Sequence, residues 1–379
     1  MRPWRGGLDQ STSAPSHGHV FSRLMEDVMQ KSIERIAGDC EGVSYEFPVF
    51  RFAGADKAAP SAYLQAALHA GELPGVVAID ALMPMLNKAE AEDRIKGNIT
   101  IVPWANPIGR AQYHFGEHQG RFHLGTRTNF NRGFPLLAAP DTRLLPDASF
   151  GGADQRLKSR LVQLSLGHDI VLDLHCDDEG LAYLYVHTSL WPEMADCAAA
   201  MGVDAVVLWS EDTDGTFEGA SIMPYQNAAA DVAKFDRRVA TTVEYRGILD
   251  VDGALASADA AGLYRLLAAR GVISDDALPA PGPFKGVAAP LENIDMMPAP
   301  RGGAVLYDVK PGDRVTRGAR LATIVHAPGE ADGRTEVFAP QDGIILTRRS
   351  RRIIRAGEDL LKLVGDRKST DARSGTLED

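Results

Sequence analysis

The chain has 379 residues and is 45% hydrophobic, so it can bury a large core and has room for two domains. Its net charge of −11 argues against nucleic acid or an anionic membrane surface as a main partner, because both favour a basic face. The three cysteines form no Cys-x-x-Cys pair, and no apolar leader or membrane-spanning run is present in the sequence. We therefore expect a cytoplasmic protein without nucleic-acid or membrane partners.

Predicted helices and strands alternate as far as about residue 270. Residues 1–20 are polar and expected to be disordered, and apolar residues at helical spacing predict a helix over 21–37. Short apolar runs predict strands at 45–52, 62–68, 99–103, 169–174, 181–186, 203–208 and 240–245. Further helices are predicted at 74–86, 154–167, 193–201, 227–239 and 254–270. Apolar strands separated by helices indicate an α/β fold whose sheet is covered on both faces.

A different composition begins near residue 279. Residues 279–300 are rich in proline and are interpreted as a linker or an irregular strand. Short apolar segments between glycine turns then predict a small all-β domain of about 65 residues. Its halves resemble a lipoyl or biotinyl sandwich, but residues 326–334 between them lack the lysine of a carrier domain. The predicted divisions are a first domain at 21–285, a C-terminal β-domain at 286–366 and a disordered tail at 367–379.

Two charged clusters lie outside the predicted core. An acidic run follows the strand at 169–174, and we interpret it as a solvated loop: Asp177, Asp178 and Glu179. A basic hairpin tip lies in the C-terminal part: Arg348, Arg349, Arg351 and Arg352. Solvated surface is the first interpretation of the arginines, and a subunit contact or a place beside the substrate is the alternative. The C-terminal domain is interpreted as a lid, an oligomer contact or a structural appendage, and we expect a homo-oligomer.

Two metal-ligand side chains follow the strand predicted at 62–68. His69 and Glu72 lie three residues apart, so the end of that strand would bring both to one spot at the edge of the sheet. The strand at 169–174 also runs into a histidine, His175. Two histidines and a glutamate with an open fourth position are one way in which a catalytic zinc is held. The sequence therefore predicts one Zn²⁺ per chain on these three residues.

A carboxylate stands at the end of a third strand. Glu244 lies in the strand at 240–245, and this position favours a role as general base over a structural role. Asp173 lies two residues before His175 and either orients that imidazole or caps a neighbouring loop. Cys176 is not expected to act as a nucleophile, because the histidine beside it is needed by the metal.

The stretch from residue 106 to 134 is rich in arginine, histidine, asparagine and glycine, as functional loops are. Asn131 and Arg132 are adjacent in it, and a guanidinium can pair with a carboxylate through two parallel hydrogen bonds. Three more arginines lie upstream: Arg110, Arg121 and Arg127. The loop therefore predicts a small anionic substrate, with solvated surface as the alternative.

Taken together, these motifs resemble the succinylglutamate desuccinylase/aspartoacylase family, a branch of the zinc carboxypeptidase fold. The resemblance rests on His69-x-x-Glu72, Asn106-Pro107, Asn129-Phe130-Asn131-Arg132, Asp173-Leu174-His175 and Glu244-x-x-Gly247. It covers roughly residues 40–270 and implies a mixed, mostly parallel sheet with helices on both faces, followed by an appended β-domain. The Asn-Phe-Asn-Arg-Gly-Phe stretch is similar to the branch that includes N-acetyl-diaminobutyrate deacetylases.

The resemblance also implies an activity, the hydrolysis of the amide bond of a small N-acyl amino acid. Zinc would be held by His69, Glu72 and His175, with Glu244 as general base and then acid. Asn131 and Arg132 would hold the substrate carboxylate, and Arg121 or Arg127 would polarise the scissile carbonyl.

The sequence departs from the family at two places. His-Ala-Gly-Glu replaces the common His-Gly-Asn-Glu and keeps both ligands. Asn129 replaces the acidic residue of Asp-Leu-Asn-Arg, so the resemblance leaves the orienting role of that acid unassigned in this chain.

Two other functions compete with the predicted zinc-dependent deacylase. A metallocarboxypeptidase acting on peptides would use the same residues, although an appended domain that narrows the site favours small substrates. A non-catalytic binding or carrier protein is disfavoured by the missing lysine and the intact metal set.

Overall fold

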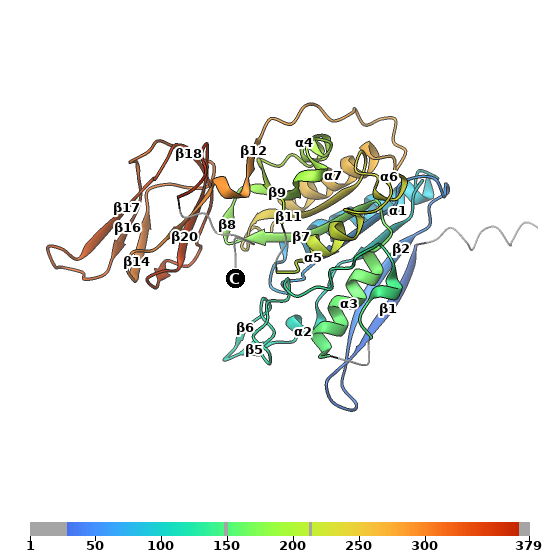
Figure 1. Ribbon diagram of the computed structural model, residues 1–379, viewed down its shortest axis with the longest axis horizontal. Helices are drawn as coiled ribbons and strands as arrows, with labels where there is room; N and C mark the ends of the chain where they lie inside the picture. The colour runs from blue at the N-terminus through green and yellow to red at the C-terminus, as the bar shows by residue number, and fades with distance from the viewer. Residues whose placement is uncertain (1–28, 148–150, 212–213, 371–379) are drawn as a thin grey trace, which may run out of the picture.

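The computed structural model describes residues 29–147, 151–211 and 214–370 (Figure 1). A large sheet is covered by helices on both faces, and smaller antiparallel sheets follow at the C-terminal end. This confirms the predicted α/β class with an appended all-β part. Among the residues described, no helix combines the length and the apolar character that crossing a membrane requires. The predictions for residues 1–20 and 371–379 lie outside the described residues.

Within the described chain the large sheet has nine strands, in the order β1-β2-β4-β3-β7-β11-β9-β10-β12. Their bounds are β1 Gln30–Ala37, β2 Ser44–Phe52, β3 Ala62–Ala66, β4 Ile99–Val102, β7 Ile170–Asp177, β9 Ala182–His187, β10 Ala205–Trp209, β11 Val239–Gly247 and β12 Val287–Pro290. Parallel pairing joins β4, β3, β7 and β11, and again β9, β10 and β12. The pairs β1–β2, β2–β4 and β11–β9 are antiparallel, so the sheet is mixed and mostly parallel, as predicted.

Two hydrophobic cores lie on opposite faces of this sheet. α1 Pro74–Ala91, α4 Ala195–Met201 and α7 Gly253–Ala269 cover one face, and α3 Ala153–Ser165 and α5 Phe217–Ile222 cover the other. Successive strand residues point to opposite faces, so Leu64 and Leu172 join the first core while Tyr63 and Val171 join the second. The central strands are therefore apolar on both faces, which explains why their sequences are nearly unbroken apolar runs.

The helix predicted over 21–37 is wrong where the structure can be compared with it. Residues 21–28 lie outside the described part, and residues 30–37 form the edge strand β1, paired with β2. Ile33 is 55% exposed and Ile36 is 5% exposed, which is the alternation of a strand. The i, i+3 spacing of these isoleucines suggested a helix, and pairing with β2 overrides that local preference.

The helix predicted over 227–239 is also wrong for most of its length. Only the short helix α6 Ala230–Ala233 forms there, and Lys234 ends it with a φ of 49°. The Nζ of Lys234 donates to Asp169, which lies just before β7, and the chain turns into β11. The helix α5 was not predicted.

The C-terminal part is a sandwich of two antiparallel sheets. In the described chain one sheet has the order β13-β20-β18-β15 and the other β17-β16-β14-β19. Their bounds are β13 Ile294–Pro298, β14 Gly303–Tyr307, β15 Arg314–Val315, β16 Arg320–Val325, β17 Arg334–Phe338, β18 Gly343–Arg348, β19 Ile353–Ile354 and β20 Asp359–Gly365. Leu321, Ile324, Ile345 and Leu363 are among the residues of its core.

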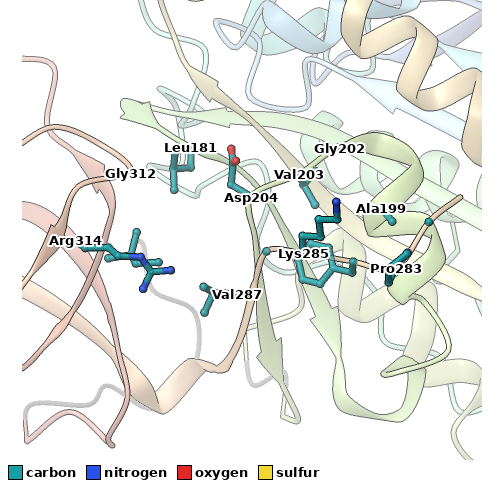
Figure 2. A pocket seen from close by; sticks show the side chains of 14 residues that line it. Leu181, Ala199, Gly202, Val203, Asp204, Pro283, Lys285, Val287, Gly312 and Arg314 are labelled. Atoms are coloured by element: carbon teal, nitrogen blue, oxygen red, sulfur yellow. The ribbon is translucent and has the colours of Figure 1, made fainter.

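The proline-rich segment connects the two parts. Its strand β12 pairs with β10 in the large sheet, whereas β13 pairs with β20, so the change of sheet falls between Pro290 and Ile294. A groove of about 540 Å³ lies at this junction, with Arg314 of the C-terminal part and Lys285 of the connecting segment on its lining (Figure 2). At the far end, the N–H of Ser369 donates to the carbonyl of Glu292, so the chain is held in place at least this far.

Candidate active site

Three neighbouring strands of the large sheet carry the predicted site residues toward one edge. β3, β7 and β11 pair in parallel in this order. His69 follows β3, His175 lies near the end of β7, and Glu244 lies in the second half of β11. Because the carboxyl ends of parallel strands meet at the same edge, residues far apart in sequence come together there.

The carboxylate of Glu72 lies between the two imidazoles. Its Oε1 is 2.8 Å from Nδ1 of His69, and its Oε2 is 2.8 Å from Nδ1 of His175. One ligand atom from each of the three buried residues lies within 4.8 Å of the others. Within the described ranges, His69, Glu72 and His175 form the group of side chains that could hold a metal ion.

A tight turn places His69 and Glu72. Ala67 has a φ of 57°, the N–H of Glu72 donates to the carbonyl of His69, and α1 begins at Pro74. Gly71 allows the ring of His118 to approach, since a Cβ at Gly71 would lie 3.2 Å from its Nδ1. Any larger side chain at position 71 would therefore require the ring of His118 to shift by a few tenths of an ångström.

Both imidazoles are oriented through their other nitrogen. Nε2 of His69 lies 2.7 Å from Oδ1 of Asn129, and Nε2 of His175 lies 2.9 Å from Oδ2 of Asp173. Oδ1 of Asn129 also accepts a hydrogen bond from the backbone N–H of Asn131. This second bond holds the amide oxygen of Asn129 toward His69. In the tautomer that carries the hydrogen on Nε2, both imidazoles donate outward and present Nδ1 to Glu72, which is the arrangement expected of oriented metal ligands.

The position of Asn129 gives this residue a role that the resemblance left unassigned. Asn129 orients His69 although it is an amide and not the acid of the family motif. An amide oxygen accepts an imidazole N–H as a carboxylate does, so the orienting contact survives without the negative charge.

Burial and neighbouring charges shift the pKa values of the three groups in different directions. Burial lowers the pKa of His69, and the charge of Glu72 only partly opposes this. Burial would also lower the pKa of His175, but Asp173 and Glu72 outweigh it and hold that pKa well above the usual value. Burial would raise the pKa of Glu72, yet the two imidazoles hold it well below the usual range. Glu72 is therefore ionised at neutral pH, which is its metal-binding form, whereas the carboxylates beside His175 favour its protonated imidazole, so a bound metal would have to displace that proton.

The structure separates the two candidate arginines. Nη1 of Arg121 lies 3.2 Å from Oε1 of Glu72 and 3.3 Å from Nδ1 of His69. Arg127 is exposed, and its backbone N–H donates to the carbonyl of His123. Arg121 is thus placed beside the predicted ligands, whereas Arg127 lies at the surface of the loop.

Asn131 and Arg132 lie in the same loop, close to Asn129. Oδ1 of buried Asn131 accepts the backbone N–H of Phe217 at the start of α5, so it fixes the loop to the fold. Arg132 is partly buried, and its Nη1 donates to the carbonyl of Asn131.

Glu244 is placed by strand register. In the parallel pairing of β11 with β7 it lies opposite His175, and the register shifts between Glu244 and Gly247. Cys176 is 5% exposed, and burial raises the pKa of its thiol well above the usual value, with added effects of Glu72 and Glu244. A buried thiol of raised pKa is a poor nucleophile, in agreement with the sequence analysis.

Two buried residues of β3 that hold Asp173 in place were not predicted from the sequence. Gln65 donates through Nε2 to Oδ1 of Asp173, and Tyr63 donates its hydroxyl to Oε1 of Gln65. All of them are buried, so the carboxylate that orients His175 is itself held in place. The sequence contains a signal for this contact, because Gln65 lies in an otherwise apolar strand and a buried glutamine needs a polar partner.

Comparison with known proteins identifies the family of this chain. The model of the succinylglutamate desuccinylase/aspartoacylase catalytic domain matches residues 58–269, which include His69, Glu72, His175 and Glu244. The chain belongs to this family. The family match ends before the C-terminal β-domain, and no curated protein is significantly similar to the chain in sequence.

Solved structures extend the likeness over both parts. A succinylglutamate desuccinylase/aspartoacylase family protein from Shewanella amazonensis SB2B is 27% identical, with a TM-score of 0.76 over 89% of this chain and 99% of that one. A second structure, from Shewanella frigidimarina NCIMB 400, is 23% identical, with a TM-score of 0.77 over 90% and 98%. The product-bound ectoine utilization protein EutE (DoeB) from Ruegeria pomeroyi is 18% identical, with a TM-score of 0.69 over 90% and 96%. The last two similarities concern the fold.

Proposed function

We propose that the protein hydrolyses the amide bond of a small N-acyl amino acid, with one Zn²⁺ held by His69, Glu72 and His175. The convergence of these three buried donors in a chain of this deacylase family carries the proposal. Imidazole nitrogens and a carboxylate oxygen are ligands that zinc prefers. When bound, Zn²⁺ supplies a Lewis acid that polarises a carbonyl and makes water more acidic.

In this proposal Glu244 moves the proton. It accepts a proton from the attacking water as the new C–O bond forms. It then delivers this proton to the amine nitrogen as the amide C–N bond breaks, and the products are a carboxylate and a free amino acid. Its position opposite His175 on the neighbouring strand supports this role.

Arginines and an asparagine of the loop would position the substrate. We assign the scissile carbonyl and the oxyanion that follows to Arg121, because its guanidinium lies beside Glu72 and His69. Arg132 would pair with the substrate carboxylate, next to Asn131 in the same loop.

Three narrower expectations belong to the same proposal. The chain is expected to belong with the branch that includes N-acetyl-diaminobutyrate deacetylases, which the Asn-Phe-Asn-Arg-Gly-Phe stretch at 129–134 resembles, and N-acetyl-diaminobutyrate is one candidate substrate. The protein is expected to work in the cytoplasm and as a homo-oligomer. Size-exclusion chromatography with light scattering tests the last expectation.

A panel of substrates tests the function. Purified protein is assayed by mass spectrometry with N-acetyl and N-succinyl amino acids, N-acetyl-diaminobutyrate, and peptides with a free C-terminus, before and after removal and return of Zn²⁺. We expect turnover of N-acyl amino acids that is lost with the metal and restored by Zn²⁺. Turnover of the peptides alone would favour a metallocarboxypeptidase, and a metal-loaded protein that turns over none of these compounds would contradict the proposal.

A further inference from the structure

The two charged clusters of the sequence, interpreted there as solvated, bind each other. The acidic turn, residues 177–179, follows His175 and Cys176 directly. The basic clamp consists of Arg348, Arg352 and Lys362 of the C-terminal β-domain. We propose that the basic clamp positions the active site by holding the acidic turn, and through it the ends of β7 and β11. This inference rests on the proposed function only where its test measures substrate turnover.

Both arginines of the clamp bind the carboxylate of Glu179. Its Oε2 accepts Nε of Arg348 at 2.5 Å, and its two oxygens accept Nη2 of Arg352 at 2.7 and 3.0 Å. The backbone also joins the two parts, because the short strand β8 Glu179–Gly180 pairs with β18. Strand β8 lies on the side of the large sheet that faces the C-terminal domain (Figure 1). Glu179, the last residue of the acidic turn, and Gly180 therefore form an added strand of the C-terminal sheet.

Lys362 holds the turn from β20. Its ammonium pairs with the carboxylate of Asp177, and the two side chains are only 5% and 9% exposed. Asp177 also accepts the hydroxyl of Tyr183 at 2.9 Å. A buried pair of this kind fixes geometry, because removing one partner leaves the other charge buried without compensation.

The clamp is itself fixed within its own domain. The guanidinium carbons of Arg348 and Arg352 lie 5.3 and 4.9 Å from the ring centre of Tyr307. Nη1 of Arg348 also donates to the carbonyl of Val309 at 2.7 Å. These contacts within the C-terminal domain restrain both guanidinium groups in addition to their contacts with Glu179.

The acidic turn joins the two strands that carry the chemistry. Asp177 lies two residues after His175 and pairs with Gly247, three residues after Glu244. The N–H of Ile248 donates to the carbonyl of Asp178 at 3.1 Å, and a Cβ on Gly247 would come 2.8 Å from that oxygen. A displacement of the turn would therefore move a predicted ligand and the predicted base together.

Neutral variants of the clamp test the proposal in the full-length, zinc-loaded protein. The test variants are Arg348→Gln with Arg352→Gln, and Arg352→Gln alone in case the double variant does not fold. Arg351→Gln is the matched control for Arg352→Gln, because it also removes one positive charge from the same hairpin, at an exposed residue for which the described structure gives no ion pair. The conservative variant is Arg348→Lys with Arg352→Lys. Zinc affinity is measured by chelator competition, and kcat and KM by substrate turnover.

We expect the glutamine variants to bind Zn²⁺ at least about tenfold more weakly and to lower kcat with little change in KM, as loss of an outer contact to a metal site does. The lysine variant should recover most of both. Zinc affinity and kcat within twofold of wild type, or an equal loss in Arg351→Gln, would overturn the proposal. If the wild type hydrolyses no N-acyl amino acid, the proposed function fails, but the zinc affinities still decide whether the clamp positions the metal residues.

Discussion

Glu244 and His175 occupy paired positions on neighbouring parallel strands, β11 and β7. Paired residues point to the same face of a sheet, so the carboxylate lies on the side where His175 meets Glu72. Burial raises the pKa of the Cys176 thiol, and the charges of Glu72 and Glu244 add to this effect, which agrees with two carboxylates close to this point. The proposed base and one of the proposed metal ligands, His175, are thus placed by one strand register.

Loss of a ligand histidine should abolish tight metal binding. His69→Ala and His175→Ala each remove one of the converging donors. We expect zinc affinity to fall by more than the roughly 10–100-fold that follows loss of an outer contact. Metal content after dialysis, measured by mass spectrometry, checks this. His326→Ala in the C-terminal domain is the control, and full zinc content in both ligand variants would show that the site is wrong.

Two substitutions of Asn129 should separate the effect of its hydrogen bond from the effect of a negative charge at this position. Asn129→Ala removes the acceptor of the His69 Nε2–H, so zinc should bind roughly 10–100-fold more weakly. Asn129→Asp keeps an acceptor and should hold zinc at least as tightly as the wild type. Chelator competition measures both affinities. An alanine variant with wild-type affinity would show that Asn129 does not orient His69.

The two arginines should differ in their effect on turnover. Arg121→Gln removes the guanidinium beside Glu72 and should lower kcat by about 10²–10³-fold, as loss of an oxyanion donor does. Arg127→Gln changes an exposed side chain in the same loop and should leave kcat nearly unchanged. Steady-state kinetics decide between them. The reverse order of effects would assign the carbonyl to Arg127.

The site residues were predictable where a local pattern coincides with a strand end. His69, His175 and Glu244 each follow or end an apolar run, and parallel pairing then brings them to one edge. The same local reasoning failed at β1, where isoleucines at helical spacing lie in an edge strand. It also could not show that Glu179 binds Arg348, because the pairing of β8 with β18 joins residues far apart in the chain.

Stability should depend on the ionisation of Asp169. Burial would raise the pKa of Asp169, but Lys234 and the N–H of Ser61 outweigh it and lower that pKa. The folded form thus binds the proton less tightly than the unfolded chain, so this contribution is complete above about pH 4 and is lost as pH falls through the folded pKa.

Urea unfolding of Asp169→Asn between pH 7 and pH 3 checks this sign. We expect the variant to lower the free energy of unfolding by about 1–3 kcal/mol at pH 7, and the difference should narrow below about pH 4. Asp231→Asn, at an exposed position on α6, is the control and should have little effect. A difference that grows on acidification would contradict the assignment.

Zinc content and kcat of Glu244→Gln, measured beside the wild type on the best N-acyl amino acid, test the central claim most directly. The substitution keeps the size of the side chain and removes the base, while His69, Glu72 and His175 remain. We predict one zinc per chain in both proteins and a kcat lowered by about 10²–10⁴-fold in the variant. A zinc-loaded variant with wild-type kcat would contradict the account.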